Sequence, residues 1–364
     1  MFEIIFLAVI CIYFIETVLF IIGASKKFDT LPEDKLPSVT IVVAARNEEK
    51  NILSCLKSLN DVQYQEDKIE IVIVNDNSTD KTGELIENFI KDKPKFKMLV
   101  PDGQIGKLNG KANALALAIK NSSNEIILTT DADCIVPPKW AKKIASYYKE
   151  NVALVCGYTT QKDFSAFSGM QAVDFIYLLG VAAGTINFNK PLSCIGNNMS
   201  YRRSAYNTVG GFEALPFSVT EDSQLMLKIA QLENSKVIYP LEKDALVVSE
   251  PCPDIASLFW QKKRWGVGGL DIGFRGYIIM LPSFLTHLAL LISPFFYSAQ
   301  VVYLIFFKIF IDFFFLYPLH KKLNLKLRFR SFITFQIYLL IYVLFLPIII
   351  MFSKNVKWKE RLFN

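Results

Sequence analysis

The sequence predicts an α/β fold: a doubly wound, parallel sheet with helices on both faces, joined to membrane-spanning helices. Short apolar segments alternate with amphipathic segments between residues 38 and 160, which is typical of βαβ units. The composition is 52% hydrophobic and the mean hydropathy is +0.31, which is too apolar for an ordinary soluble domain. Nearly uncharged segments long enough to cross a bilayer lie towards both ends of the chain.

The expected strands and helices of the sheet region follow one another at short intervals. Each expected strand is a short run rich in branched apolar residues, and each expected helix has apolar residues on one face. The expected strands are residues 39–45, 69–75, 96–100, 125–130 and 152–158. The expected helices are residues 48–59, 80–90, 111–120 and 138–149.

The first apolar segment, residues 2–23, is expected to be a retained membrane anchor. Lys26 and Lys27 follow it directly. A cleaved signal peptide would instead carry its basic residues before a shorter apolar core. By the positive-inside rule, the two lysines place the next part of the chain in the cytosol.

Three further spans are expected at residues 278–292, 295–316 and 332–352. The first is short and contains Pro282, so we expect it to be tilted or re-entrant. Lys308 and Asp312 are four residues apart in the second span, where a charge pair on one helical face costs less than two lone charges.

Basic residues after the second and third spans bear on the topology. If all three spans cross, the basic loop 321–330 faces the cytosol and the basic tail lies outside. If the first span does not cross, the loop lies outside and the tail faces the cytosol. The loop is the more basic, which favours three crossings. Residues 175–186 are also apolar but too short to cross, so we expect a core or interfacial helix there.

Asp131 and Asp133 follow the expected strand 125–130, and Asp76 follows the strand 69–75. Ligands of open α/β sheets bind at the carboxyl ends of strands, and carboxylate oxygens suit a divalent cation that holds a diphosphate. A solvated turn after a strand is the alternative for the acid pair. Residues 78–80 alone are explained as an N-terminal cap of the next helix.

Two lysines, Lys107 and Lys111, lie at the start of the helix expected from residue 111. Helix N-termini attract anions, and lysine usually prefers the other end, so these lysines suggest a phosphate contact or a surface turn. The spacing does not fit a P-loop. Arg202 and Arg203 are interpreted as exposed loop residues, with a phosphate contact as the alternative.

Ser218 and Glu221 have the spacing of a capping box at the start of a helix. Asp222 comes next and has the chemistry of a general base as well as that of a first-turn acid.

Other functional classes are disfavoured by the composition. The only histidines, His287 and His320, lie in or beside apolar segments, and the six cysteines are scattered singly, so zinc sites and histidine catalysis are not expected. We expect the cysteines to be buried thiols in a reducing compartment. The net charge of +6 is interpreted as loops facing anionic lipid, not as nucleic-acid binding.

Four motifs occur in order between the anchor and the later spans. They are Asp76, Asp131-x-Asp133, Thr220-Glu221-Asp222 and Gln261-x-x-Arg264-Trp265. Over about residues 38–270 this set resembles the membrane-bound family 2 glycosyltransferases, relatives of the cellulose, chitin, hyaluronan and poly-N-acetylglucosamine synthases and of ceramide glucosyltransferase. The resemblance implies a GT-A type nucleotide-sugar-binding domain.

The resemblance also implies roles on the donor side. Asp76 would bind the base or ribose of the nucleotide, and Asp131 and Asp133 would bind the diphosphate through Mg²⁺ or Mn²⁺. Lys111 would contact a donor phosphate, and Arg264 would bind the departing diphosphate.

On the acceptor side, the resemblance implies that Asp222 is the catalytic base. Gln261 and Trp265, with Arg264, would line the place where the acceptor meets the leaving diphosphate. Glu221 is expected to contact the acceptor or the diphosphate.

The expected function is an inverting transfer of a sugar from a nucleotide-sugar, UDP-linked, to a lipid-linked or saccharide acceptor, for glycolipid or cell-surface polysaccharide synthesis. The alternatives are a processive polysaccharide synthase and a non-catalytic nucleotide-sugar-binding subunit. Membrane lipid is an expected partner and nucleic acid is not.

The expected location is the inner or cytoplasmic membrane, crossed several times, with the catalytic domain in the cytosol. The expected domains are an anchor at residues 1–24, the glycosyltransferase domain at 36–250, an interfacial segment at 251–277, the C-terminal transmembrane region at 278–352 and a basic tail at 353–364.

Overall fold

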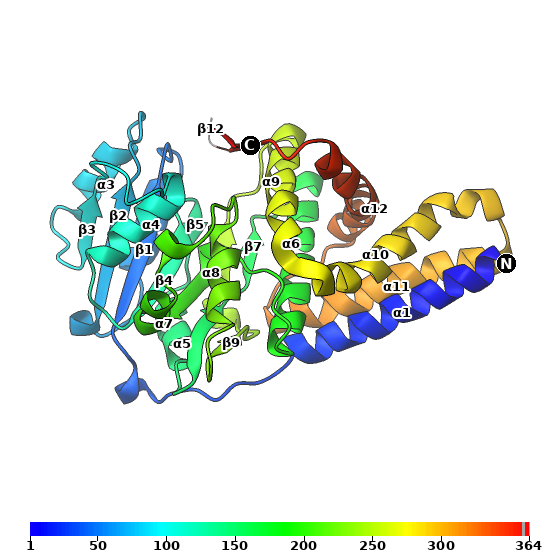
Figure 1. Cartoon of the computed structure of the whole chain (residues 1–364), viewed down its shortest axis with the longest axis horizontal. Helices are drawn as coiled ribbons and strands as arrows, with labels where there is room; N and C mark the ends of the chain where they lie inside the picture. The colour runs from blue at the N-terminus through cyan, green and yellow to red at the C-terminus, as the bar shows by residue number, and fades with distance from the viewer. Residues whose placement is uncertain (359–360, 364) are drawn as a thin grey trace. The chain divides into compact units, whose positions relative to one another are not determined.

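The computed structural model describes residues 1–358 and 361–363 and contains two compact units (Figure 1). The sheet unit comprises residues 26–160 and 189–250, and the helical unit comprises residues 1–25, 161–188 and 251 onward. Lys359, Glu360 and Asn364, which belong to the expected basic tail, lie outside the described residues.

The strands of the sheet unit are mostly short. They are β1 (Val39–Ala45), β2 (Ile69–Asn75), β3 (Phe96–Leu99), β4 (Ile126–Asp131), β5 (Cys134–Ile135), β6 (Val152–Cys156), β7 (Thr159–Gln161), β8 (Met199–Arg202), β9 (Lys236–Ile238) and β10 (Val247–Ser249). The helices are α2 (Ile52–Asn60), α3 (Thr82–Ile90), α4 (Gly110–Lys120), α5 (Trp140–Ser146), α7 (Arg203–Thr208) and α8 (Glu221–Ile229).

A seven-stranded sheet of order β3-β2-β1-β4-β8-β6-β9 forms the centre of this unit. β1 to β4 run parallel, but β8 pairs antiparallel with both β4 and β6. The α/β class is therefore confirmed, and β8, a strand that was not predicted, makes the expected parallel sheet a mixed one. A smaller sheet of order β5-β10-β7 completes the unit.

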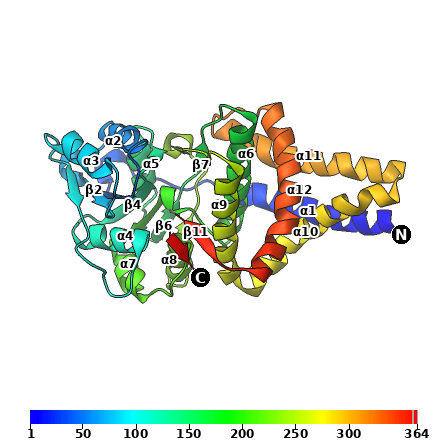
Figure 2. The ribbon, with the colours of Figure 1, turned by 90° about the horizontal axis from the view of Figure 1, so that it is seen from above.

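Helices cover both faces of the large sheet, as expected. Seen from above, α2, α3 and α5 lie on one side of the strands, and α4 and α7 lie on the other (Figure 2). Ile41 and Val43 of β1 belong to one apolar core with Ile52 of α2 and Trp140 of α5, and all four are fully buried. Each such side chain stabilises the fold by roughly 2 kcal/mol.

The helical unit is built from long apolar helices and a C-terminal hairpin. Its elements are α1 (Phe2–Ala24), α6 (Ala166–Asn187), α9 (Ile255–Gly268), α10 (Gly273–Ile292), α11 (Ala299–Lys322), α12 (Phe329–Phe352), β11 (Val356–Trp358) and β12 (Arg361–Phe363). α1, α10 and α11 extend together towards one end of the unit, while α6, α9 and α12 run across them (Figures 1 and 2).

Among the residues that the structure describes, five helices are long and apolar enough to cross a membrane. They are α1, α6, α10 with the turn after it, α11 and α12. The N-terminal helix and three C-terminal helices were expected. The interpretation of residues 175–186 as too short is wrong, because α6 has 22 residues. The expectation of a short first C-terminal span is also wrong, because α10 begins at Gly273 and continues through Pro282.

Glycines let α6 pack directly against its neighbours. A Cβ on Gly184 would lie 2.7 Å from the Phe20 Cα of α1, and a Cβ on Gly180 would lie 2.6 Å from a Leu319 methyl of α11. The Asn187 side chain donates a hydrogen bond of 3.0 Å to the Gly23 carbonyl. α6 is therefore a core helix of this unit, which was one of the two expectations, a core helix or an interfacial helix.

A polar cluster lies between four of the apolar helices. Asp312 accepts a hydrogen bond of 2.6 Å from the Tyr13 hydroxyl and forms an ion pair of 2.7 Å with Lys308. Lys308 also donates to Gln336 at 2.8 Å, and the Tyr13 and Tyr177 hydroxyls are 2.8 Å apart. The expected pairing of Lys308 with Asp312 is thus confirmed, and it links α11 to α1, α6 and α12.

Asn198 holds three segments of the sheet unit together. It is 1% exposed, accepts a hydrogen bond of 2.9 Å from the Trp140 indole, and donates to the carbonyls of Tyr158 (2.7 Å) and Ala245 (2.9 Å). We expect Asn198→Ala to lower the free energy of unfolding by roughly 3 kcal/mol or more, because three buried groups lose their partners. Denaturation in detergent, followed by tryptophan fluorescence, measures this.

Asn121→Ala is the matched control for this prediction. Asn121 is exposed at the end of α4, and its side chain makes one bond, to the Leu117 carbonyl. We expect a loss of about 0.5 kcal/mol. Equal losses for the two variants would contradict the structural role of Asn198.

Candidate active site

The carboxyl end of β4 carries the two acids singled out by the sequence. Asp131 is the last residue of β4, and Asp133 directly precedes β5. β5 pairs with β10 through Cys134 and Ser249, so the segment that carries both acids is held at each end. The Asp131 side chain is 34% exposed and thus accessible from solvent.

Asp76 lies at the same edge of the sheet, one residue beyond β2. Its N–H donates to the Ala45 carbonyl at the end of β1 (2.8 Å), and its own carbonyl accepts from the Arg46 guanidinium (2.8 Å). β1 in turn pairs with β4, with Ala44 opposite Asp131. The strand order therefore brings the ends of β2, β1 and β4 together, as the positions of Asp76 and Asp131 predict.

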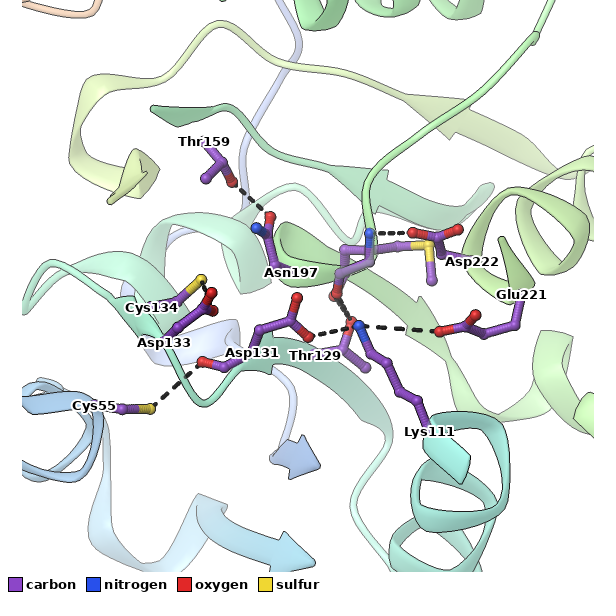
Figure 3. Close-up of polar contacts among 12 residues, drawn as sticks. Cys55, Lys111, Thr129, Asp131, Asp133, Cys134, Thr159, Asn197, Glu221 and Asp222 are labelled. Carbon is purple, nitrogen blue, oxygen red and sulfur yellow. Dashed lines mark hydrogen bonds and ion pairs between the residues drawn. The ribbon is translucent and has the colours of Figure 1, made fainter. Parts of the chain in front are cut away.

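Lys111, in the first turn of α4, points at the acids (Figure 3). Its Nζ lies 2.5 Å from Oδ1 of Asp131 and 3.9 Å from Oε1 of Glu221. Burial alone would lower the pKa of Lys111, but the carboxylates of Asp131, Glu221 and Asp222 raise it above the usual lysine value. Lys111 is therefore a cation held within an acidic site, and the interpretation as a surface turn is wrong for it. Lys107 is exposed, as that interpretation has it.

Asp222 is held in place by two backbone donors near the start of α8. Its Oδ2 accepts from the Gly196 N–H at 2.5 Å, and its Oδ1 accepts from the Ser223 N–H at 2.8 Å. The Ser223 hydroxyl donates to the Cys194 carbonyl at 3.3 Å, which ties the same segment to α8. The carboxylate thus has a defined orientation.

The residue that joins Asp222 to β4 is Gly196, which sequence reasoning did not assign to the site. Its N–H donates to Asp222, and its carbonyl accepts from the Thr129 hydroxyl of β4 at 2.6 Å. A Cβ at this position would lie 2.9 Å from Oδ2 of Asp222, so a side chain does not fit. The adjacent Asn197 accepts from the Thr159 hydroxyl at 2.8 Å. The polar run Gly196-Asn197-Asn198 is the feature of the sequence that could have indicated a site residue here.

The capping box expected at Ser218 and Glu221 is absent from this described segment. α8 begins at Glu221, with Thr220 as its cap residue and without a side-chain cap. The Ser218 hydroxyl instead lies 3.2 Å from the Thr220 N–H. Glu221 is therefore the first residue of the helix, and its side chain faces Lys111.

Arg202 and Arg203 are structural, and the expectation of exposed loop residues is wrong. Arg202 donates to the Val152 and Tyr148 carbonyls at 2.9 Å each. Arg203 donates to the carbonyls of Asn124 (2.8 Å) and Ile119 (2.7 Å). Both guanidiniums are thus used to fix the end of β8 against neighbouring segments, because these carbonyls need donors.

Two buried thiols lie beside the acid pair. The Cys55 thiol is 3.6 Å from the Asp131 carbonyl, and the Cys134 thiol is 3.5 Å from Oδ1 of Asp133. Burial, and then the nearby carboxylates, raise the pKa of both thiols, so both remain protonated. The expectation that the cysteines are buried is confirmed for Cys55, Cys134 and Cys156, but Cys194 and Cys252 are half-buried and Cys11 is exposed on α1.

Gln261, Arg264 and Trp265 lie on α9 in the helical unit. Trp265 contacts the Phe175 ring of α6, with ring centroids 5.4 Å apart, and the Lys262 ammonium lies 4.2 Å from its ring centre. The structure therefore brings together the acids and Lys111 within the sheet unit, and Gln261, Arg264 and Trp265 within the other.

Comparison with known families agrees with this arrangement. The protein family described as Glycosyl transferase family 2 matches residues 40–210. The family described as Glycosyl transferase family group 2 matches residues 126–353, which is more than half of the chain. The chain belongs to the family 2 glycosyltransferases. This confirms the resemblance stated from the motifs.

Two relatives of this glycosyltransferase share its sequence pattern. Probable glycosyltransferase YdaM of Bacillus subtilis (strain 168) is 27% identical over 248 residues, covering 64% of this chain and 56% of that protein. Poly-beta-1,6-N-acetyl-D-glucosamine synthase of Staphylococcus aureus (strain COL) is 28% identical over 254 residues, covering 67% and 57%. The glycosyltransferase thus matches little more than half the length of these curated relatives.

A solved structure shares the fold of this glycosyltransferase. It is the mannosyltransferase PcManGT from Pyrobaculum calidifontis in complex with GDP-Man and Mn²⁺. The TM-score is 0.62 at 19% identity, and the match covers 94% of this chain and 97% of that one. The likeness confirms the expected GT-A type α/β fold.

Lys111→Gln tests the cation of the site in this glycosyltransferase. We expect the rate of nucleoside diphosphate release to fall on the order of 10²-fold, because the acids of the site lose the positive charge that they surround. Steady-state kinetics with a nucleotide-sugar measure the fall. Lys107→Gln removes an exposed lysine four residues earlier and should leave the rate unchanged; equal effects at the two positions would exclude a specific role for Lys111.

Proposed function

We propose that this glycosyltransferase moves a sugar, with inversion, from a UDP-linked donor to a lipid-linked or saccharide acceptor at a membrane, for glycolipid or cell-surface polysaccharide synthesis. The observation that carries the proposal is the group of acids from β4 and α8 around Lys111. Acids and a fixed cation in one site suit a donor whose diphosphate leaves as the sugar is transferred.

On the donor side, Asp76 binds the base or ribose, because it follows β2 at the same edge of the sheet as the acid-bearing end of β4, with only β1 between the two strands. Lys111 binds a phosphate oxygen: its ammonium already lies 2.5 Å from Asp131, so a small movement of the side chain places it on a phosphate. Arg264, planar and always charged, binds the departing diphosphate with two parallel hydrogen bonds.

Asp131 and Asp133 fit a Mg²⁺ or Mn²⁺ ion. Proteins usually hold such an ion with one or two carboxylates plus substrate phosphates. Within residues 1–358 and 361–363 there is no group of three or more His, Cys, Asp and Glu that could hold a metal alone, so the donor phosphates complete the ligand set. When bound, the ion neutralises charge on the leaving diphosphate. The Mn²⁺ in the PcManGT complex supports this assignment.

On the acceptor side, Asp222 takes the proton of the attacking hydroxyl. The N–H groups of Gly196 and Ser223 each occupy one carboxylate oxygen, which fixes the direction from which the hydroxyl approaches. Glu221, Gln261 and Trp265 contact the acceptor or the diphosphate.

The protein acts at the cytoplasmic membrane, with the sheet unit in the cytosol. Five helices with membrane-spanning length and composition support the membrane location, and Lys26-Lys27 after α1 supports the orientation. The glycosyltransferase domain lies within residues 36–250, without α6, which belongs to the helical unit. An interfacial segment at 251–277 and a membrane-embedded region at 278–352 follow it.

A processive synthase is the second candidate. It is favoured by the 28% identity to a protein named as a poly-beta-1,6-N-acetyl-D-glucosamine synthase. The length of the product, determined by mass spectrometry, separates repeated addition from a single transfer.

Asp222→Asn should lower transfer by about 10³-fold while nucleotide-sugar binding stays unchanged, because the amide keeps the shape but accepts no proton. Detergent-purified protein is assayed for nucleoside diphosphate release over a panel of donors with native lipid extract, and donor binding is measured by calorimetry. Glu213→Gln, an exposed acid before α8, is the control. Near-normal transfer by Asp222→Asn would remove this residue from the chemistry. Absence of release by the unsubstituted protein would favour a binding subunit.

Removal of divalent metal should abolish transfer, and added Mn²⁺ or Mg²⁺ should restore it. The same experiment on Asp133→Asn should require more metal for half-maximal rate, because one of two carboxylate ligands is lost. Titration of the chelated enzyme with metal measures both effects. Full activity in excess chelator would contradict a metal at Asp131 and Asp133.

A further inference from the structure

The chain passes between the two units four times, at residues 25–26, 160–161, 188–189 and 250–251. β8 follows α6 in sequence but pairs with β4, which precedes α6, so the segments on either side of α6 form one folded body. A folded body lies on one side of a membrane. All four connections of the helical unit therefore emerge on the same side, here called the sheet side.

α6 obeys this constraint although its 22 residues are about 33 Å long, enough to cross a bilayer. Both of its ends lead into the sheet unit. Extended chain cannot return through lipid, because its backbone groups would lack partners. α6 therefore starts and ends on the sheet side.

The beginning of α12 lies beside the connection at residue 161. Arg328, directly before α12, forms an ion pair of 3.0 Å with Asp163 and donates to the Asp163 carbonyl at 2.9 Å. A Cβ on Gly169 of α6 would lie 2.2 Å from the hydroxyl of Ser331 in the first turn of α12. The first turn of α12 is thus held at the start of α6, on the sheet side.

The end of α12 lies beside α9, which follows the connection at residue 250. Lys263 of α9 donates to the Ser353 hydroxyl at 3.2 Å, and a Cβ on Gly266 would meet Ile350 of α12 at 2.4 Å. α9 has 14 residues, about 21 Å, which is too short to cross. It also precedes α10, the next helix able to cross, so the end of α12 is on the sheet side as well.

We propose that α12 lies within the leaflet on the sheet side without crossing the membrane, and that its exposed apolar face contacts the acyl chains of that leaflet. α1, α10 and α11 are then the helices that cross. α10 leads away from the sheet side and α11 leads back, which agrees with the contact between Arg328 and Asp163.

One face of α12 is apolar and exposed along its length. Ile337 (60%), Ile341 (53%) and Phe345 (48%) recur at intervals of four residues, a single stripe of the helix. The opposite face carries buried side chains such as Phe335 and Leu339, which pack within the helical unit. Both ends of the helix carry positive charges that lipid headgroups attract. The apolar stripe between these ends therefore contacts acyl chains.

Basic residues flank α12 at both ends. Arg328 and Arg330 lie at its start, and Lys354 and Lys357 follow its end. With α12 inside one leaflet, all of them face the anionic surface of the sheet side, together with Lys26-Lys27. The turn between α10 and α11, residues 293–298, contains no charged residue and is on the far side. A crossing α12 would place Lys354 and Lys357 on the far side instead.

Cysteines introduced one at a time test on which side of the membrane each position of the full-length protein lies. Lys326→Cys lies before α12, Lys354→Cys after it, and Tyr297→Cys in the turn between α10 and α11; all three positions are exposed. We expect a membrane-impermeant maleimide to label Tyr297→Cys in intact cells, and to label Lys326→Cys and Lys354→Cys only after permeabilisation. The unsubstituted protein, with its native cysteines, gives the background.

Asn324→Cys and Asn355→Cys, also exposed, repeat the comparison if a lysine variant is poorly produced. The proposal would be overturned if the position after α12 were labelled under the same conditions as Tyr297→Cys while the position before α12 were not. Inversion of all three patterns would change the orientation of the protein but leave α12 on one side. The outcome does not depend on enzymatic activity, so it stands apart from the proposed function.

Discussion

The antiparallel pairing of β8 with β4 is the constraint on which the site depends. It places residues that come after α6 beside a strand formed before α6, with Met199 opposite Thr129. The short turn that leads into β8 contains Gly196, whose peptide group bonds to β4 on one side and to Asp222 on the other. Without this strand, the carboxylates of β4 and α8 would have no common framework.

The site that results concentrates negative charge, and its electrostatics follow from that. Asp131, Glu221 and Asp222 lie around one ammonium group, whose protonated form they stabilise. Burial, and after it the carboxylates of Asp133 and Asp131, raise the pKa of the Cys55 and Cys134 thiols and keep them protonated. Cations are therefore favoured at this edge of the sheet.

Sequence reasoning succeeded where the local pattern is set by burial. β1 and β2 are long, apolar on both faces and were predicted to the residue, and Asp131 and Asp133 were found because they follow such a strand. β8 was missed because Met199–Arg202 is short and partly polar, and its place is set by a strand some 70 residues away. Gly196 was missed because the polar run that contains it does not show which carboxylate its N–H reaches. Arg202 was misread because its partners, backbone carbonyls and the Glu125 carboxylate, are brought close only by the fold.

In the sequence, α6 lies between the two parts of the sheet unit, and this has a consequence for biogenesis. During synthesis, β1 to β7 leave the ribosome before α6, and β8 leaves after it, so the central sheet stays incomplete while an apolar helix is being made. α6 finds its partners on α1, α11 and α12, and the last of these is synthesised near the end of the chain. Maturation of the two units is therefore interdependent, and a fragment cut to residues 26–250 carries an uncovered apolar helix in its middle, a liability for aggregation.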